Sequence, residues 1–359
     1  MISDQMETGL DKLPTMLEEI RQAPPIVRPS RFWEHLTELN LRQLEDDGFN
    51  EFKRTINRNY FQFQVVGARS PQYRAVARAW LRHPRPVVFG ARLAERLEFP
   101  PELVGRIGRA VANKTYAVYL ALLWEYVHRR DRRQVLERLD EPLLGHPVYI
   151  DYRGHRVSED LCNSVLEFTA IMEAVPAGEP IRSVIELGAG YGRIAWVFLS
   201  MMPGVRYVVV DIPPALAIAE QYLSTLFADR HVFGFRHFDG FADVADEFEA
   251  AQIVFLTPNQ LDLLPPQRAD LFVNVSSLHE MRPDQIEHYF AAIQTHCAGR
   301  FYTKQWQRSI NEHDGLVISH DGYPVPAGWQ VVFDRPHPVQ VEFFEALYKL
   351  SEASTIAAR

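Results

Sequence analysis

The sequence predicts an α/β fold, a doubly wound parallel sheet that follows a mostly helical N-terminal region. From residue 181 onward, short apolar runs alternate with segments whose apolar residues recur at helical spacing, which is typical of such a sheet. The first of these runs ends in a glycine-rich loop that opens a helix. By contrast, segments near the N-terminus such as RFWEHLTELNLRQLEDDGF and QYRAVARAWLRH have amphipathic helical patterns.

The length of 359 residues suggests two domains, which we place at 1–150 and 151–359. Apolar residues make up 47% and charged residues 23% of the chain, as in soluble globular proteins. A net charge of −8 argues against nucleic acid as a partner. Two cysteines, Cys162 and Cys297, cannot form a disulfide framework, so we expect a cytoplasmic protein.

No segment of the sequence suggests a membrane protein. The N-terminus, MISDQMETGLDKLP, has no apolar core of a signal peptide. The most apolar stretch, TYAVYLALLW, stops at Glu125, well short of the roughly 20 residues that a spanning helix needs. We therefore expect no membrane partner.

The elements of the second domain follow from these patterns. After a turn-rich stretch, helices are predicted at 160–174, 193–202, 214–227 and 284–297. Strands are predicted at 183–187, 207–211, 253–257, 271–275 and 300–305. The late runs GWQVVF and PVQVEFF predict a closing hairpin.

The glycine loop is the sharpest local signal in the chain. It contains Glu186, Gly188, Gly190 and Gly192, spaced G-x-G-x-G rather than the G-x-G-x-x-G of dinucleotide-binding loops. Gly188 suits a tight turn and Gly190 lets the backbone approach a ligand. Asp211 ends the next strand, where a carboxylate would accept hydrogen bonds from two ribose hydroxyls. Enzymes that bind NAD share such an acid, so Asp211 alone does not discriminate between cofactors.

The segment IVFLTPNQLDLLPPQRADLFVNVSSLHEM does discriminate. Together with the glycine loop and Asp211, its Leu-Pro step, DLFV strand and LHEM end resemble the class I S-adenosylmethionine-dependent methyltransferases. The resemblance covers residues 181–297. It implies a Rossmann-like, seven-stranded sheet with an antiparallel C-terminal hairpin, and S-adenosyl-L-methionine as cofactor.

The same resemblance assigns cofactor contacts. It implies that Glu186, Gly188 and Gly190 line the methionine and ribose portion and that Asp211 holds the ribose. Asn259 and Gln260 would lie beside adenine, although the family usually has an acid there; Asp239 ranks second. Further candidates for cofactor contact are Asn163, Ser164 and Ser276.

A second resemblance spans most of the chain. The segments FKRTINRNYFQF, DLCNSVLEF and SSLHEM and the tail YPVPAGWQVVFDRPHPVQVEFFEALY together resemble bacterial sugar O-methyltransferases. This implies a small-molecule acceptor, either a sugar or a glycosylated natural product. Candidates for the acceptor wall are the N-terminal residues Trp33, Asn57, Asn59, Tyr60 and Phe61.

His279 is the candidate general base. A hydroxyl acceptor is weakly acidic, and imidazole has an unperturbed pKa of about 6.5, which suits proton abstraction at neutral pH. The histidine after this strand is also the base in the plant-type small-molecule O-methyltransferases that the segment resembles. Glu280 is a second polar group for the site, and could orient His279 only if both lie in a loop. Asp314 and Glu312 are the alternative orienting carboxylates.

Several alternatives remain open at this point. The acceptor could instead be an aromatic hydroxyl or an amine, and the protein could be an NAD-dependent oxidoreductase or a cofactor-binding scaffold without activity. The His-Asp pairs at 313–314 and 320–321 match no defined metal-site spacing, so we expect no required metal. Helical regions like the N-terminal one often form dimer interfaces, so we expect a homodimer.

Overall fold

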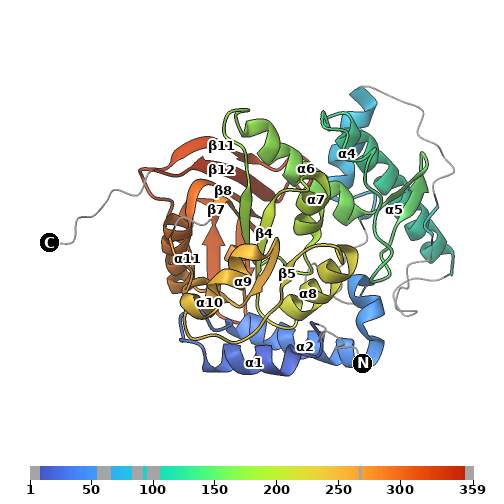
Figure 1. Ribbon diagram of the computed structural model, residues 1–359. Helices are drawn as coiled ribbons and strands as arrows, with labels where there is room; N and C mark the ends of the chain where they lie inside the picture. The colour runs from blue at the N-terminus through green and yellow to red at the C-terminus, as the bar shows by residue number, and fades with distance from the viewer. Residues whose placement is uncertain (1–8, 55–65, 83–91, 95–105, 267–268, 352–359) are drawn as a thin grey trace. The chain divides into compact units, whose positions relative to one another are not determined.

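The computed structural model describes residues 9–54, 66–82, 92–94, 106–266 and 269–351 (Figure 1). The chain divides into two compact units. The first, the sheet unit, comprises residues 1–38, 174–336 and 342–359, and the second, the helical unit, comprises residues 39–173 and 337–341. Neither boundary coincides with the predicted division at residue 150.

The sheet unit is built on an eight-stranded sheet with the order β11-β12-β8-β7-β3-β4-β6-β5. The six strands from β8 to β5 are parallel, and β12 and β11 close the other side as an antiparallel hairpin. The strands are β3 (Ser183–Leu187), β4 (Arg206–Val210), β5 (Val232–Phe233), β6 (Ile253–Leu256), β7 (Ala269–Val275), β8 (Cys297–Trp306), β11 (Gln330–Pro336) and β12 (Phe343–Lys349).

Helices cover both faces of this sheet, as β4 illustrates. Val208 and Val210 point into a core shared with the last helices of the unit, whereas the ring of Tyr207 lies 5.8 Å from that of Phe198 in α7. Successive residues of a strand point to opposite faces of the sheet, so a strand that is apolar throughout is buried on both faces. The helices are α7 (Arg193–Met201), α8 (Ala215–Leu226), α9 (Ala245–Ala250), α10 (Pro258–Leu261) and α11 (Pro283–His296).

The predicted α/β class, the mostly parallel sheet and the closing hairpin are confirmed. The strand count differs from the expected seven, because the two-residue strand β5 adds to the edge beside β6. A second hairpin, β9 (Arg308–Asn311) and β10 (Leu316–Ser319), occupies a segment in which the sequence predicted no strand. Most of its residues are half-buried or exposed, and only Asn311 and Ile318 are buried, so its hydrophobic pattern is weak.

The helical unit contains α4 (Pro71–Arg82), α5 (Arg106–His128) and α6 (Glu159–Ala174). Its turn-rich stretch forms a small antiparallel hairpin, β1 (Ile150–Tyr152) with β2 (His155–Val157), which the sequence left as a linker. Glu125 in α5 is buried and accepts hydrogen bonds from Tyr152 Oη at 3.0 Å and Arg153 Nε at 2.8 Å. These bonds compensate part of the cost of burying its charge.

Residues 9–38 pack on the sheet unit although they belong to the amphipathic N-terminal region. This segment contains α1 (Leu13–Gln22) and the start of α2 (Arg31–Asp47). Lys12 Nζ lies 2.6 Å from the buried carboxylate of Glu220 in α8, and Glu19 lies 2.6 Å from His237 Nδ1. Burial raises the pKa of Glu220, and the nearby Lys12 ammonium opposes that rise.

We expect Lys12→Met to destabilise the folded protein, because the substitution leaves the Glu220 carboxylate buried beside an apolar side chain. The free energy of unfolding should fall by about 1–3 kcal/mol. Urea denaturation of the full chain at neutral pH measures this change.

The matched control is Arg21→Met, which removes an exposed ion pair with Glu18 in the same segment. Such surface pairs contribute roughly 0–1 kcal/mol, so this variant should unfold almost as the wild type does. Equal stability of both variants would mean that the segment is not anchored through Lys12.

Candidate functional site

The candidate site lies at the carboxyl edge of the parallel strands of the sheet unit. The turns after β3, β4, β6 and β7 all open at this edge because the strands are parallel and in register. Ligands of doubly wound sheets bind at such an edge. The fold therefore brings together four of the segments that the sequence analysis selected.

The glycine loop after β3 has the backbone that its sequence predicts. Gly188, Gly190 and Gly192 adopt φ values of +70°, +60° and +85°, a region that side chains rarely enter. A Cβ at Gly188 would lie 2.2 Å from Ser277 Oγ, so the loop packs directly on the turn after β7. A Cβ at Gly190 would meet no atom within 4 Å, so the described residues leave that side of the loop open.

Asp211 is joined directly to this loop. Its Oδ2 accepts a hydrogen bond from Gly190 N at 2.7 Å, and its Oδ1 accepts one from Ile212 N at 2.7 Å. Burial raises the pKa of Asp211 to about 7, the two backbone donors oppose the rise, and the negative charge of Glu280 adds to it. Asp211 and Glu280 therefore lie close enough to interact across the edge.

Glu186, by contrast, faces the interior of the sheet unit. Its side chain is buried, and Oε2 accepts a hydrogen bond from Tyr207 Oη at 2.7 Å. Tyr207 stands on the neighbouring strand β4, opposite Val184 in the parallel register. This bond fixes the carboxylate at the start of the glycine loop.

The candidate residues for adenine contact after β6 differ in their hydrogen-bond partners and burial. Gln260 is fully buried: its Oε1 accepts from Thr257 N at 3.1 Å and its Nε2 donates to Arg236 O at 2.8 Å. Asn259 Nδ2 donates to Glu19 Oε1 at 2.6 Å, and its Oδ1 is buried without a hydrogen-bond partner among the described residues. Asp239, the second-ranked carboxylate, has a side chain that is 95% exposed.

The other cofactor candidates fall in two places. Ser276 follows β7 with a φ of +57°, and its N–H donates to Lys304 O at 2.8 Å. Such backbone strain in a residue other than glycine is often found at functional sites. Asn163 and Ser164 lie in α6, in the helical unit, so their part in the site stays a prediction.

His279 and Glu280 share a 3₁₀ turn, Leu278–Glu280, after β7. His279 Nε2 lies 3.4 Å from Glu280 Oε1, so these sequence neighbours face each other as they would not on an α-helix. Glu280 Oε2 is buried and has no hydrogen-bond partner among the described residues. The carboxylate of Glu280 therefore lies close enough to act on the imidazole through its charge.

Two amides behind this turn, Gln305 and Asn274, were not among the predicted site residues. Gln305, near the end of β8, lies with its Oε1 2.9 Å from His279 Nδ1. Its Nε2 lies 2.6 Å from Oδ1 of Asn274, which stands on the adjacent strand β7. Both amides are fully buried. A polar residue inside an apolar strand was the available signal, since a buried amide requires hydrogen-bond partners.

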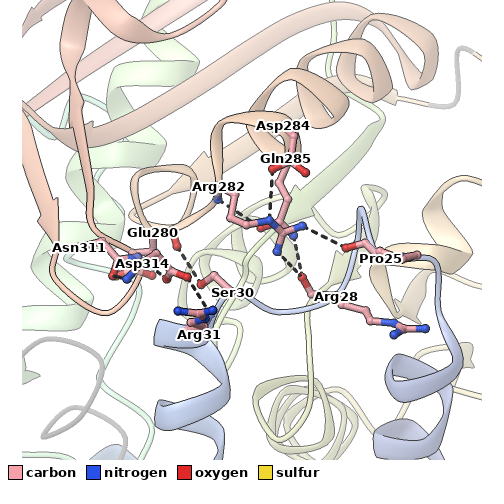
Figure 2. A network of polar contacts seen from close by, with 10 residues as sticks. All are labelled: Pro25, Arg28, Ser30, Arg31, Glu280, Arg282, Asp284, Gln285, Asn311 and Asp314. Atoms are coloured by element: carbon pink, nitrogen blue, oxygen red, sulfur yellow. Dashed lines mark hydrogen bonds and ion pairs between the residues drawn. The ribbon is translucent and has the colours of Figure 1, made fainter.

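Asp314, predicted to orient His279, instead caps helix α2 (Figure 2). It accepts hydrogen bonds from Arg31 N at 3.1 Å, Phe32 N at 3.2 Å and Asn311 Nδ2 at 2.9 Å. Burial works in the opposite direction, but these donors lower the pKa of Asp314 overall. Glu312, the other candidate, is exposed in the same turn.

The segment before α2 is attached beside the His279–Glu280 turn (Figure 2). Ser30 Oγ donates to the backbone carbonyl of Glu280 at 3.2 Å. The Arg282 guanidinium donates to Pro25 O and Gln285 Nε2 donates to Arg28 O, at 3.1 and 2.8 Å. The N-terminal segment therefore forms one side of the candidate site.

Within the described ranges, no group of three or more His, Cys, Asp or Glu residues could hold a metal ion. In the same ranges, no helix is long and apolar enough to cross a membrane. Of the proposed acceptor wall, Trp33 lies in α2, and Asn57, Asn59, Tyr60 and Phe61 lie outside the described residues.

Comparison with known proteins gives only weak similarities. No family model and no curated protein matches the chain. Among solved structures, the PH0226 protein from Pyrococcus horikoshii OT3 matches with a TM-score of 0.38 and 12% identity, covering 54% of this chain and 92% of that one.

The matching structures include methyltransferases. The Burkholderia thailandensis 1,6-didemethyltoxoflavin-N1-methyltransferase, with bound 1,6-didemethyltoxoflavin and S-adenosylhomocysteine, has a TM-score of 0.36 and 17% identity over 54% of this chain and 79% of its own. Mitomycin 7-O-methyltransferase has a TM-score of 0.34 and 14% identity over 63% and 67%. At such low scores and identities, these similarities do not establish what this chain does.

We expect Gly188→Ala to destabilise the sheet unit, because the new methyl group would collide with Ser277 and the residue would keep a left-handed backbone. The backbone penalty alone is about 1–2 kcal/mol. The free energy of unfolding in urea measures it. Gly178→Ala is the control, since a Cβ there meets nothing within 4 Å. Unchanged stability of Gly188→Ala would contradict the close packing of the loop on the turn.

Proposed function

We propose that the chain is an S-adenosyl-L-methionine-dependent O-methyltransferase that acts on a small molecule, with a sugar or glycosylated natural product as acceptor. The hydrogen bond between Asp211 and Gly190 N carries this proposal. It places a buried carboxylate beside an open glycine loop, at the edge where nucleoside cofactors bind to doubly wound sheets.

The residues at this edge fit an adenosyl group. No Lys, Arg or His of the described residues forms an ion pair with the buried Asp211, so ribose hydroxyls would supply the donors that its carboxylate lacks. Asn259 offers the adenine amino group a buried oxygen that has no hydrogen-bond partner within the described part of the chain. Gly190 leaves room for the nucleoside to approach the backbone. When bound, the sulfonium cofactor supplies an activated methyl group.

The chain itself must orient the acceptor and remove its proton. His279 Nε2 takes the proton from the acceptor hydroxyl in this proposal, and the carboxylate of Glu280, 3.4 Å away, stabilises the imidazolium that results. The Ser30 bond to Glu280 O and the Arg282 bonds to residues 25–28 hold the turn in place.

The alternative acceptor is an aromatic or other natural product with a hydroxyl or amine group. Trp306 is compatible with either acceptor class: its ring stands edge-on to His279 at 6.4 Å between centroids, and the residue is 36% exposed. An aromatic face accepts either a flat ring or the apolar face of a sugar. Parallel assays with both acceptor classes, read by a mass increase of one methyl group, separate the two.

We also propose that the protein works in the cytoplasm as a homodimer. The two cysteines are free and buried, which suits a reducing compartment. Sedimentation of the purified full chain gives the oligomeric state directly.

We expect Asp211→Asn to weaken the binding of S-adenosylhomocysteine by about 10- to 100-fold, because hydrogen bonds to a charged acceptor contribute roughly 1 kcal/mol more each than those to a neutral one. Isothermal titration calorimetry measures the dissociation constant. Asp239→Asn, on an exposed carboxylate, is the control and should bind as the wild type does.

Binding to the wild type should also depend on pH. Since the pKa of Asp211 is about 7, the carboxylate that accepts ribose hydroxyls is lost as the pH falls through 7. Affinity should be about 10-fold weaker at pH 6 than on the plateau above pH 8. Asp211→Asn should flatten this profile. A pH-independent wild type would contradict the assignment of Asp211 to the ribose.

We expect His279→Ala to lower kcat by about 100-fold or more while leaving S-adenosylhomocysteine binding unchanged, because only the proton acceptor is lost. Single-turnover methylation at saturating cofactor measures the rate. His231→Ala is the control, since His231 precedes β5 and therefore lies at the opposite edge of the sheet. Full activity of His279→Ala would rule out its role as the base.

A further inference from the structure

We infer that Gln305, held by Asn274, is a positioning residue that fixes the tautomer of His279 with its proton on Nδ1 and its free electron pair on Nε2. The inference rests on the proposed role of His279 as general base. It is carried by a chain of four buried groups that runs from the backbone of the glycine loop to the imidazole.

The chain begins at a backbone carbonyl, which can only accept hydrogen bonds. Asn274 lies with one amide atom 2.8 Å from Leu187 O, so that atom must be the donor Nδ2. The same Nδ2 donates to Ser277 Oγ at 3.0 Å. The other amide atom of Asn274 is therefore Oδ1, and it accepts from Leu278 N at 3.2 Å.

The orientation of Asn274 dictates that of Gln305. The amide atom of Gln305 that lies 2.6 Å from Asn274 Oδ1 must be the donor Nε2. It also donates to Thr303 Oγ1 at 2.9 Å. Turning the Gln305 amide over would place two oxygens in contact, and both side chains are fully buried, so water offers no substitute.

Gln305 therefore presents its oxygen to His279. Gln305 Oε1 accepts from the backbone N–H of His279 at 3.3 Å and lies 2.9 Å from Nδ1. An amide oxygen has no proton to give, so the hydrogen on this contact belongs to Nδ1. In a neutral imidazole only one nitrogen carries hydrogen, which leaves Nε2 as the acceptor.

This arrangement suits a general base both before and after it takes up a proton. Before proton transfer, Nε2 holds an electron pair and faces Glu280 Oε1 at 3.4 Å. After the transfer, Nδ1 still donates to Gln305 Oε1, and the imidazolium lies beside the Glu280 carboxylate, whose Oε1 is 3.4 Å from Nε2. The opposite tautomer would carry its hydrogen on Nε2 and could not accept the proton of a hydroxyl.

The chain also links the base to the cofactor loop. Leu187 O belongs to the last residue of β3, directly before Gly188. Asn274 thus connects the glycine loop, the turn that carries His279 and strand β8 in one buried network.

The test is nitrogen NMR of the full chain labelled with ¹⁵N-histidine at a pH where His279 is neutral. The His279 signals are those absent from His279→Ala. The wild type should show the tautomer protonated on Nδ1. Gln305→Met, which has similar length but no amide, should lose that preference, with a signal from the form protonated on Nε2.

The same variant should lower kcat by at least about 10-fold, within the roughly 100-fold range of general base catalysis, without weakening cofactor binding. Gln307→Met is the matched control. Gln307 follows Gln305 by two residues in the chain, and its side-chain Nε2 lies 3.4 Å from Phe343 O, a long contact. It should keep the wild-type tautomer and rate.

Two results would overturn the inference: a wild type protonated on Nε2, or a Gln305→Met variant that folds, as judged by its melting temperature, and keeps the Nδ1 tautomer. The proposed function is tested separately. If His279→Ala methylates at the full rate, His279 is not the general base. The tautomer of His279 in the wild type then still decides whether the two amides orient its ring.

Discussion

One buried amide, that of Asn274, joins the parts of the candidate site. Its nitrogen donates to Leu187 O and Ser277 Oγ, and its oxygen accepts from Leu278 N and Gln305 Nε2. The end of β3, the turn after β7 and the end of β8 are thus held in one geometry. A buried amide that keeps all its partners is rigid, because any other arrangement would leave polar groups unpaired.

Acidic groups give this edge its electrostatic character. Asp211 is ionised only in part near neutral pH, because burial and the charge of Glu280 both raise its pKa to about 7. Glu280 in turn faces His279. An edge of this kind favours ligands that bring hydrogen-bond donors or positive charge, and a sulfonium nucleoside brings both. The N-terminal segment lies beside it and fixes the turn through Ser30.

The sequence predicted those parts of the fold that follow from local patterns. The bounds of β3 matched the prediction, and the glycine loop met Asp211 because parallel strands end at one edge. Asn274 and Gln305 stand out only as polar residues within buried strands, and no local pattern pairs them, since their contact depends on the register of β7 against β8. Asp314 caps a helix that begins 283 residues earlier, and no spacing predicts so distant a partner. Amphipathic helices do not reveal which unit they pack on, so the attachment of residues 9–38 was also missed.

A crystal structure of the full chain with S-adenosylhomocysteine tests the central claim most directly. We expect the ribose hydroxyls within hydrogen-bond distance of Asp211, the adenine beside Asn259, and His279 Nε2 facing the space beyond the sulfur. A nucleoside bound elsewhere, or an imidazole whose Nε2 faces away from that space, would contradict the assignment of this edge as a methyl-transfer site.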